Sequence, residues 1–368
     1  MPASNAQQLT AALEDLIVGV LERYPELPGL IVEIEGPVLR YRKALGLADA
    51  SGTALTLDHP VRLASNTKTY VAAALLRLME EGRVALDDAI ARHLSAEPIQ
   101  VLTSGGYDVQ AITLRHLLTH TSGLYDYSDS ADFDRKVRAR THSWTRLQQL
   151  EDAMTLGDAY GPPGEVFRYS DTGYILLAEI LEQVTQTPHY GAALRQLLPL
   201  EPLGLAHTWL EVFEEPPADL PPRAHQYLEG ISNIDQDATA DLFGGGGLVA
   251  TLADLLTFHR ALFHGQVYRQ PKTLEVMLST VAAKRGGPIA YDIPQVPGQY
   301  RMGLFVLPRG GLTAYLHGGY YGTEAVHFPE IDVTLALTVN TAESDAGDEL
   351  VEAVARLLVE HAHSASPE

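Results

Sequence analysis

The sequence of 368 residues contains no cysteine. This absence excludes a cysteine nucleophile, thiolate ligands to a metal ion, and disulfide bonds. It leaves undecided whether the protein works in an oxidising or a reducing compartment, because a disulfide pattern is the usual sequence signal for that distinction.

Long apolar runs are also missing. No segment approaches the ~20 consecutive apolar residues that a membrane-spanning helix needs. The first residues, Met1 to Gln8, do not show a basic stretch followed by an apolar one, so we expect no signal peptide. The sequence therefore predicts a cytoplasmic protein without a membrane span, or a periplasmic or secreted one if the sequence is a trimmed form of a longer chain.

Positive charge is scarce relative to negative charge. Lysine and arginine number 26 against 47 aspartates and glutamates, which gives a formal net charge of −21. A chain of this charge repels nucleic-acid phosphates and anionic lipids, so we expect neither as a partner.

Hydrophobic periodicity predicts secondary structure at both ends of the chain. Apolar residues at helical spacing predict helices over residues 7–24 and 346–361. Short β-branched or alternating runs separated by turn residues predict strands. These strands cover residues 30–34, 38–45, 300–307, 312–316, 324–328 and 333–339.

The middle of the chain is mainly helical in pattern. Helices are expected over residues 67–81, 112–118 and 172–185. The segments 121–165 and 211–246 are rich in Gly, Pro, Ser and Asp, and are predicted to be loops.

This order of elements predicts an α/β (α+β) fold. Strands from both ends of a chain most economically join one antiparallel sheet, with the two terminal helices on a face. We expect residues 1–62 and 285–368 to form this α/β sandwich and residues 63–284 to form a mainly helical part. A functional site is expected where the two parts meet, because clefts favour such boundaries.

The first candidate for chemistry is the segment Ser65-Asn66-Thr67-Lys68, which opens a strong helical pattern. Residues three apart on a helix lie ~5–6 Å apart at Cβ, so Lys68 can reach the hydroxyl of Ser65. A serine at the positive end of a helix dipole is well placed for developing negative charge, and a desolvated lysine can take its proton. The segment taken alone also fits a plain helix cap followed by a surface lysine.

Two further segments carry candidate side chains. Tyr169-Ser170-Asp171 stands just before a predicted helix, where Tyr169 can act as a general base or a proton relay if it enters a cleft beside Lys68. His317-Gly318-Gly319-Tyr320 follows a predicted strand, and its two glycines allow a substrate backbone to pair with the sheet edge. The backbone N–H groups of Ser65 and Tyr320 could then form an oxyanion hole. In isolation, the first segment also fits a packed tyrosine and the second a simple turn.

Together the three segments resemble the penicillin-recognising serine hydrolases, which include class C β-lactamases, DD-peptidases, D-aminopeptidases and related esterases. The family pattern is S-x-x-K, then Y-x-N, then K-T-G or H-x-G. Residues 117–124 (Leu-Leu-Thr-His-Thr-Ser-Gly-Leu) and the glycine-rich run 245–251 are also similar to family segments. The resemblance implies a β-lactamase-like fold. It implies that Ser65 is acylated, that Lys68 and Tyr169 handle its proton, and that His317 stands where the third motif has lysine.

Two departures from the family pattern bear on mechanism and substrate. The middle motif ends in Asp171 instead of Asn, and a carboxylate near Lys68 favours its ammonium form. We therefore expect the proton-accepting role to shift towards Tyr169, with the ammonium lowering the pKa of the tyrosine. The third motif is His317-Gly318-Gly319, which lacks the cation and the hydroxyl that help to bind a substrate carboxylate.

These departures favour substrates with a free amine. The H-G-G form resembles that of D-aminopeptidases and D-amino-acid amidases, and Asp171 would suit an amine as counter-charge. We expect a serine hydrolase that acts on D-amino-acid amides, peptides or short esters. The alternatives are a β-lactamase or D-alanyl-D-alanine carboxypeptidase and, in another class, an inactive relative that only binds its ligand.

Some other residues are weaker candidates. Tyr125 and Tyr127 follow the Thr121-Ser122-Gly123 turn and are expected to help select a small-molecule or peptide substrate. His116 and His120 have the spacing of two zinc ligands on a helix, but neither a third ligand nor a catalytic glutamate is evident, so we expect no metal and no cofactor.

Overall fold

A computed structural model describes residues 5–140, 142–290, 294–342 and 344–365 of the chain. Its main sheet has six strands, all antiparallel, in the order β10-β11-β12-β13-β1-β2. The strands are β1 (Gly29–Glu35), β2 (Arg40–Gly46), β10 (Phe305–Arg309), β11 (Leu312–Gly319), β12 (Thr323–Phe328) and β13 (Val333–Thr338). The prediction that strands from both ends of the chain join one antiparallel sheet is confirmed.

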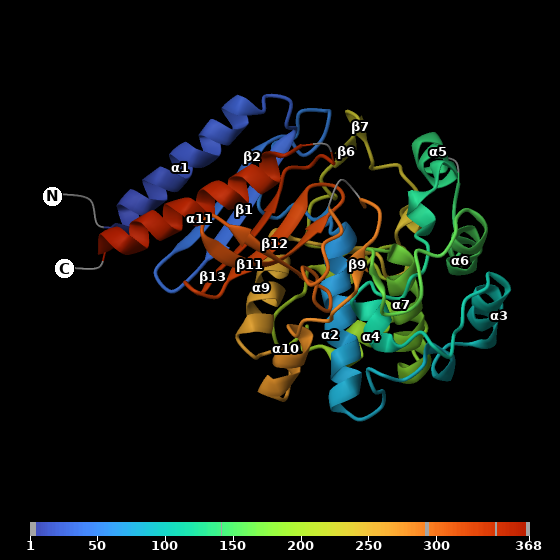
Figure 1. The fold of residues 1–368 in the computed structure, drawn as a ribbon. Helices are drawn as coiled ribbons and strands as arrows, with labels where there is room; N and C mark the ends of the chain where they lie inside the picture. Colours follow the sequence, from blue (N-terminus) through green and yellow to red (C-terminus); the bar gives the residue numbers. More distant parts are fainter. Residues whose placement is uncertain (1–4, 141, 291–293, 343, 366–368) are drawn as a thin grey trace.

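The two terminal helices, α1 (Asn5–Arg23) and α11 (Ala346–Ala365), pack against each other on one face of this sheet (Figure 1). Successive side chains of β1 point to opposite faces of the sheet, so this strand contributes to the hydrophobic core on each face. Leu30, Val32 and Ile34 pack with the terminal helices, whereas Ile31 belongs to the core on the other face. Helix α9 (Leu252–Phe263) covers that second face against β1, β12 and β13.

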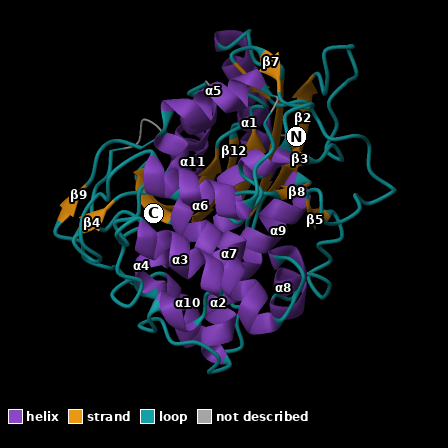
Figure 2. Cartoon of the chain, turned by 90° about the vertical axis from the view of Figure 1, so that its right-hand side faces the viewer, coloured by secondary structure: helices purple, strands orange, loops and turns teal. Residues whose placement is uncertain are grey.

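The mainly helical part surrounds helix α2 (Thr67–Glu80), whose residues 67–78 are all buried. Figure 2 shows most of this part as a dense group of helices below the sheet, whereas α5 lies higher. It contains α3 (Ala96–Ser104), α4 (Leu114–Leu118), α5 (Ala131–Ala139), α6 (Arg146–Thr155), α7 (Asp171–Thr185), α8 (Tyr190–Leu197) and α10 (Pro271–Met277). The division of the chain at residues 62 and 285 stays a prediction.

Besides the main sheet, the described residues form three small sheets of short strands. The largest group is a three-stranded sheet with the order β3-β8-β5, formed by Val61–Arg62, Leu248–Ala250 and Thr208–Leu210. The other two are the parallel pair β4 (Val166–Phe167) with β9 (Arg285–Gly286), and the hairpin of β6 (Tyr227–Leu228) and β7 (Ile231–Ser232). Strand β3 ends directly before the turn that carries Ser65.

Three sequence predictions are wrong here. Residues 211–246 are not all loop, because β6 and β7 lie within them. Residues 121–165 are not all loop either, because α5 and α6 lie within them. These helices are held by caps: Ser130 Oγ accepts from Phe133 N, and Thr145 and Gln148 form a capping box. The strand expected from residue 300 begins only at Phe305, because Tyr300 instead turns its ring into the interior beside His317.

Among the described residues, no helix is both long enough and apolar enough to cross a membrane.

Candidate active site

Ser65 lies in the short 3₁₀ turn Ala64–Asn66, which runs directly into α2. The turn is held from two sides, since Leu63 N donates to Leu248 O at 2.9 Å and the Leu63 carbonyl accepts from Thr323 Oγ1 at 3.2 Å. Ala64 has a φ of +44°, which residues with a Cβ rarely adopt. Such strain is typical of functional sites, and here it stands directly before the candidate nucleophile.

Lys68 extends from the first turn of α2 back to Ser65, as the spacing predicts. Its Nζ lies 2.8 Å from Ser65 Oγ, 2.6 Å from the carbonyl oxygen of Gly245 and 2.6 Å from Asp171 Oδ1. The side chain is 0% exposed. The first two contacts are hydrogen bonds donated by the ammonium group, and the third is an ion pair with the Asp171 carboxylate. The geometry therefore suits a fixed positive charge beside the serine hydroxyl.

Asp171 is the first residue of α7, and its carboxylate is occupied by Lys68. A second buried carboxylate supports it, since Asp171 N donates to Asp126 Oδ2 at 2.9 Å. Burial and the nearby charge of Asp171 raise the pKa of Asp126 above its usual range. The expectation that Asp171 binds the amine of a substrate finds no support here, because the partner of its carboxylate is Lys68.

Tyr169 is buried beside the ammonium group, with Lys68 Nζ 5.0 Å from the centre of its ring. Burial and the negative charge of Asp171 raise the pKa of Tyr169 well above its usual range, while a hydrogen bond with Ser65 opposes the shift. The prediction that the ammonium lowers this pKa is wrong, because burial and the neighbouring carboxylate dominate. Tyr169 is thus a neutral phenol next to the Ser65 hydroxyl.

His317 does not contact Ser65 or Lys68 in the interactions that the structure gives it. Its Nδ1 lies 2.8 Å from the Gly318 carbonyl oxygen, which can only accept, so Nδ1 carries the proton. Its Nε2 then accepts from Tyr300 Oη at 3.1 Å. Burial first, and the charge of Lys68 second, lower the pKa of His317 to about 3. His317 is therefore a neutral imidazole in this geometry, and the catalytic role that its motif predicts stays a prediction.

The end of β11 packs closely on the turn that carries Ser65. A Cβ on Gly319 would lie 2.3 Å from the Leu63 carbonyl oxygen and 2.2 Å from Thr323 Oγ1. Only glycine allows this approach, which brings the following residue, Tyr320, beside the serine turn. The pairing of β11 with β10 stops at Leu316, so that His317, Gly318 and Gly319 pair only with β12 among the described strands. On the side of β10, residues 317–319 therefore have no strand partner among the described strands.

The two tyrosines proposed for specificity have different surroundings. The Tyr125 ring is half-buried beside Tyr160, with ring centres 5.6 Å apart. Tyr127 is 1% exposed and donates from Oη to the Ala240 carbonyl oxygen at 3.0 Å. The prediction that Tyr127 lines the cleft is therefore corrected: its ring is part of the packed interior.

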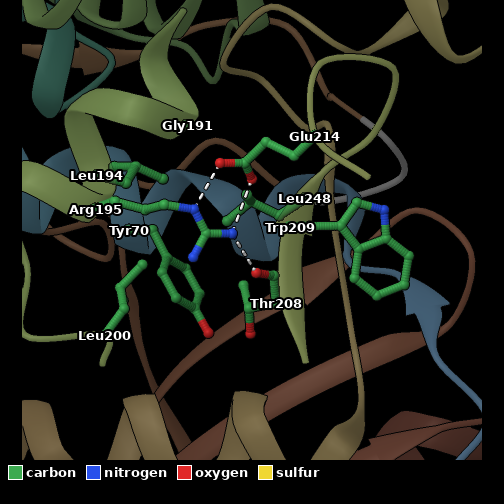
Figure 3. Close-up of a pocket in the computed structure, with 9 residues that line it drawn as sticks. All are labelled: Tyr70, Gly191, Leu194, Arg195, Leu200, Thr208, Trp209, Glu214 and Leu248. Carbon is green, nitrogen blue, oxygen red and sulfur yellow. Dashed lines mark hydrogen bonds and ion pairs between the residues drawn. The ribbon is translucent and has the colours of Figure 1, made fainter. Parts of the chain in front are cut away.

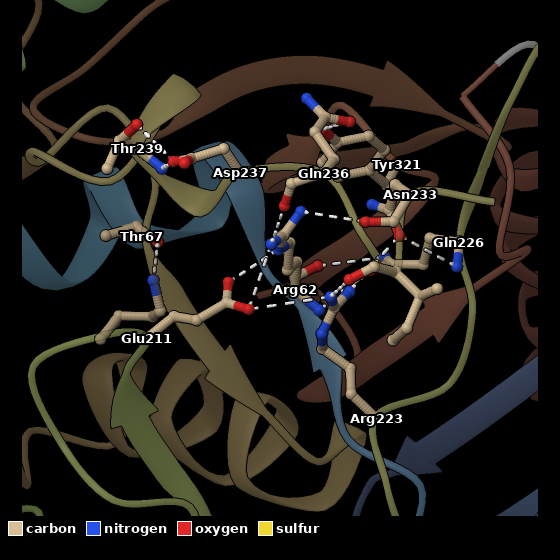
Figure 4. A network of polar contacts seen from close by, with 12 residues as sticks. Arg62, Thr67, Glu211, Arg223, Gln226, Asn233, Gln236, Asp237, Thr239 and Tyr321 are labelled. Carbon is tan, nitrogen blue, oxygen red and sulfur yellow. Dashed lines mark hydrogen bonds and ion pairs between the residues drawn. The ribbon is translucent and has the colours of Figure 1, made fainter. Parts of the chain in front are cut away.

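A buried polar network holds the strand before Ser65 (Figure 4). The guanidinium of Arg62 contacts both oxygens of Glu211, at 2.7 Å and 3.1 Å, and donates to the Gln236 carbonyl at 2.9 Å. The side-chain amide of Gln226 pairs with the backbone N and O of Arg62, at 2.9 Å and 3.1 Å, as a neighbouring strand would. Tyr321 Oη donates to Gln236 Oε1, which ties the residue after Tyr320 to the same network.

A separate small cavity is lined by Tyr70 of α2 together with residues of α8, β5 and β8 (Figure 3). Its volume is about 10 Å³, and Arg195 crosses it to pair with Glu214 at 2.6 Å. Ligand sites in proteins usually measure ~300–1,000 Å³, so this cavity is no candidate for substrate binding.

Sequence reasoning missed several residues of the site. Asp126, Gly245 and Tyr300 contact site residues from distant segments. Gly245 belongs to the family-like run 245–251, but no local pattern marks Asp126 or Tyr300. His120 belongs to the possible metal pair and to the family-like segment 117–124, but neither pattern predicts its contact with Tyr169. The structure separates that pair, since His116 caps α4 whereas the ring of His120 lies 4.2 Å from that of Tyr169. Within the described residues, no group of three His, Asp or Glu side chains is arranged to hold a metal ion.

The family model described as Beta-lactamase matches residues 18–360. The chain belongs to the beta-lactamase family. Two solved structures are similar to this chain over nearly its whole length. The D-stereospecific amidohydrolase from a Streptomyces species has a TM-score of 0.74 and 27% identity, over 93% of this chain and 98% of that chain. The D-amino acid amidase from Ochrobactrum anthropi SV3, in complex with L-phenylalanine, has a TM-score of 0.77 and 25% identity, over 96% and 100%.

Curated members of the family match over a shorter stretch. Penicillin-binding protein 4* of Bacillus subtilis (strain 168) is 32% identical over 162 residues, which are 43% of this chain and 32% of that protein. Protein flp of Staphylococcus aureus (strain MW2) is 33% identical over 153 residues, 40% of this chain and 27% of that protein. The match thus spans about a third or less of the length of these relatives.

Proposed function

We propose that this protein is a serine amidase that hydrolyses D-amino-acid amides through an acyl-enzyme on Ser65. The observation that carries the proposal is the contact of Lys68 Nζ with Ser65 Oγ, at 2.8 Å, inside a buried cluster that also contains Asp171 and Tyr169. A binding protein has no need of this costly arrangement of buried charge. The similarity to two D-specific amide hydrolases over nearly the whole chain supports the substrate class.

In the proposed acylation, Ser65 Oγ attacks the amide carbonyl carbon. The carbonyl oxygen becomes an oxyanion, and we assign its stabilisation to the backbone N–H groups of Ser65 and Tyr320. Because Lys68 donates to Ser65 Oγ, the hydroxyl hydrogen of Ser65 is free to point towards Tyr169. This proton passes to Tyr169 Oη while Tyr169 gives its own to the leaving nitrogen. The C–N bond breaks, an amine or ammonia leaves, and an ester with Ser65 remains.

Deacylation reverses this path with water. The water oxygen attacks the ester carbonyl, a water proton passes to Tyr169, and the Tyr169 proton returns to Ser65 Oγ as the acid is released. Tyr169 begins and ends each half-reaction as a phenol, which suits a group whose pKa is raised well above its usual range. Lys68 contributes a fixed charge that stabilises the negative charge developing on the oxygens around it.

The third motif supports an amide over a β-lactam. His317 is neutral, with a pKa lowered to about 3, and Gly318 has no hydroxyl. Neither provides the charge-assisted contact that a substrate carboxylate prefers. Residues 317–319 would pair with the substrate backbone instead, on the side of β10.

A substrate panel tests this proposal. We expect the purified protein to hydrolyse D-phenylalanine amide at least ten times faster than the L-amide, and the Ser65→Ala variant to have no activity. Efficient turnover of a chromogenic cephalosporin without activity on D-amides would favour a β-lactamase or a D-alanyl-D-alanine carboxypeptidase. The 32% identity to a penicillin-binding protein makes this the second candidate. Failure of every substrate together with failure of active-site labelling would favour a binding protein.

A further inference from the structure

His120 contacts the ring of Tyr169 and the backbone of both residues that flank Tyr169 in the chain. Arg168, the residue before Tyr169, donates from its backbone N–H to the His120 carbonyl oxygen at 2.9 Å. Ser170, the residue after Tyr169, donates from its backbone N–H to His120 Nδ1 at 3.2 Å. The ring of His120 packs on the ring of Tyr169 with centres 4.2 Å apart. One residue thus holds both flanks and one face of the candidate proton relay.

The chemistry of this contact defines the state of His120. A backbone N–H can only donate, so Nδ1 accepts and the proton of the neutral imidazole resides on Nε2. Burial, together with the positive charge of Lys68, lowers the pKa of His120 well below its usual range, which keeps Nδ1 free to accept.

Packing alone does not explain a histidine at this place. Among the described residues, Nε2 of His120 has no hydrogen-bond partner, and an unmatched buried donor costs free energy. His120 also has a φ of +54°, a conformation that residues with a Cβ rarely adopt. A phenylalanine or leucine would fill the space between Tyr169, Tyr174 and Tyr300 without burying an unmatched N–H. The feature that only a few side chains provide is the acceptor for Ser170 N.

We propose that His120 is a positioning residue, which acts through Tyr169 by fixing the orientation of its hydroxyl towards Ser65. This inference rests on the proposed function, since it assigns a role to Tyr169 in the serine reaction. It adds a residue that touches neither substrate nor nucleophile but sets the geometry of the proton path.

Two substitutions at position 120 separate the contacts. His120→Phe keeps a ring but removes the acceptor for Ser170 N. His120→Asn removes the ring but can present an oxygen to Ser170 N, and asparagine tolerates a positive φ better than most residues. The readout is the rate at which a fluorophosphonate probe labels Ser65, which depends on the nucleophile and not on the identity of the natural substrate. Each substitution is made in the wild-type and in the Tyr169→Phe background.

We expect His120→Phe to slow labelling at least 10-fold in the wild-type background and less than 2-fold when Tyr169 is already phenylalanine. His120→Asn should slow it by about 3-fold, again only in the presence of Tyr169. If His120→Phe does not fold, the His120→Asn pair gives the same comparison. Equal slowing in both backgrounds, or no slowing at all, would overturn the inference, because a purely structural role is independent of the Tyr169 hydroxyl. Absence of labelling in the wild type would instead refute the proposed function, and the inference with it.

Discussion

Lys68 and Asp171 form an ion pair of 2.6 Å in a site where the lysine side chain is fully buried. Desolvation makes such a pair costly to form, but the removal of one partner is costlier still because it leaves an unmatched buried charge. The same ion pair therefore affects the stability of the fold and holds the charge of Lys68 beside the Ser65 hydroxyl.

A double-substitution cycle tests this link. Asp171→Asn and Lys68→Met should each lower the free energy of unfolding, by about 3–5 kcal/mol. The double variant should recover a large part of the loss, because it buries no lone charge. Urea unfolding at neutral pH measures all four proteins. Additive losses would show that the two charges do not depend on each other.

Tyr169→Phe removes the proposed proton relay without removing the ring. We expect kcat to fall by ~10²–10⁴, the usual contribution of a positioned acid or base, while KM stays within ~3-fold. Steady-state kinetics on D-phenylalanine amide gives both values. Tyr174→Phe is the matched control, because its ring lies at a similar distance from Lys68, while Tyr174 Oη bonds to the Leu118 carbonyl at 3.0 Å and to Tyr300 Oη at 3.4 Å. A Tyr169→Phe variant with near-normal kcat would remove Tyr169 from the mechanism.

The two adjacent glycines at the end of β11 provide a further pair of variants. A Cβ on Gly319 would meet the Leu63 carbonyl oxygen at 2.3 Å, whereas one on Gly318 has no neighbour closer than 3.9 Å. Gly319→Ala should move the strand away from the Ser65 turn and lower kcat by ~100-fold, the scale of one lost oxyanion donor. Gly318→Ala should stay within ~3-fold of the wild type. Equal activity of the two variants would contradict the close packing that we assign to Gly319.

Much of this geometry could be predicted from the sequence. The terminal helices and the strands have strong periodicity, and the three-residue spacing of Ser65 and Lys68 on a helix fixes their contact. Helices α5 and α6 were missed because they contain few apolar residues, although the capping box of Thr145 and Gln148 is visible in the sequence. The roles of Asp126 and His120 could not be predicted, because contacts between distant segments create them. The raised pKa of Tyr169 depends on burial, which a motif does not encode.

Glu324 gives a pH-dependent prediction that does not involve the proposed reaction. Burial raises the pKa of the Glu324 carboxyl to about 8, and the charge of Asp348 contributes a smaller part of this shift. Its Oε2 has no hydrogen-bond partner among the described residues. The folded chain therefore holds a proton that the unfolded chain releases above about pH 4. The stability from this proton is present at acid pH and is lost as the pH rises through about 8.

Glu324→Gln keeps the shape and removes the ionisation. We expect the variant to match the wild type at pH 4 and to have a Tm at least ~2 °C higher at pH 9, where each kcal/mol of stability shifts Tm by a few degrees. Thermal unfolding followed by circular dichroism at both pH values provides the measurement. A variant that is less stable than the wild type at pH 9 would contradict the burial of an unmatched carboxylate.

The central claim is that Ser65 is the nucleophile. Peptide mapping by mass spectrometry after fluorophosphonate treatment tests it most directly. The account predicts one adduct, on the peptide that contains Ser65, with loss of D-amide hydrolysis in proportion to labelling and no adduct in Ser65→Ala. An adduct on another residue that abolishes activity, or a fully active protein whose Ser65 stays unmodified, would contradict it.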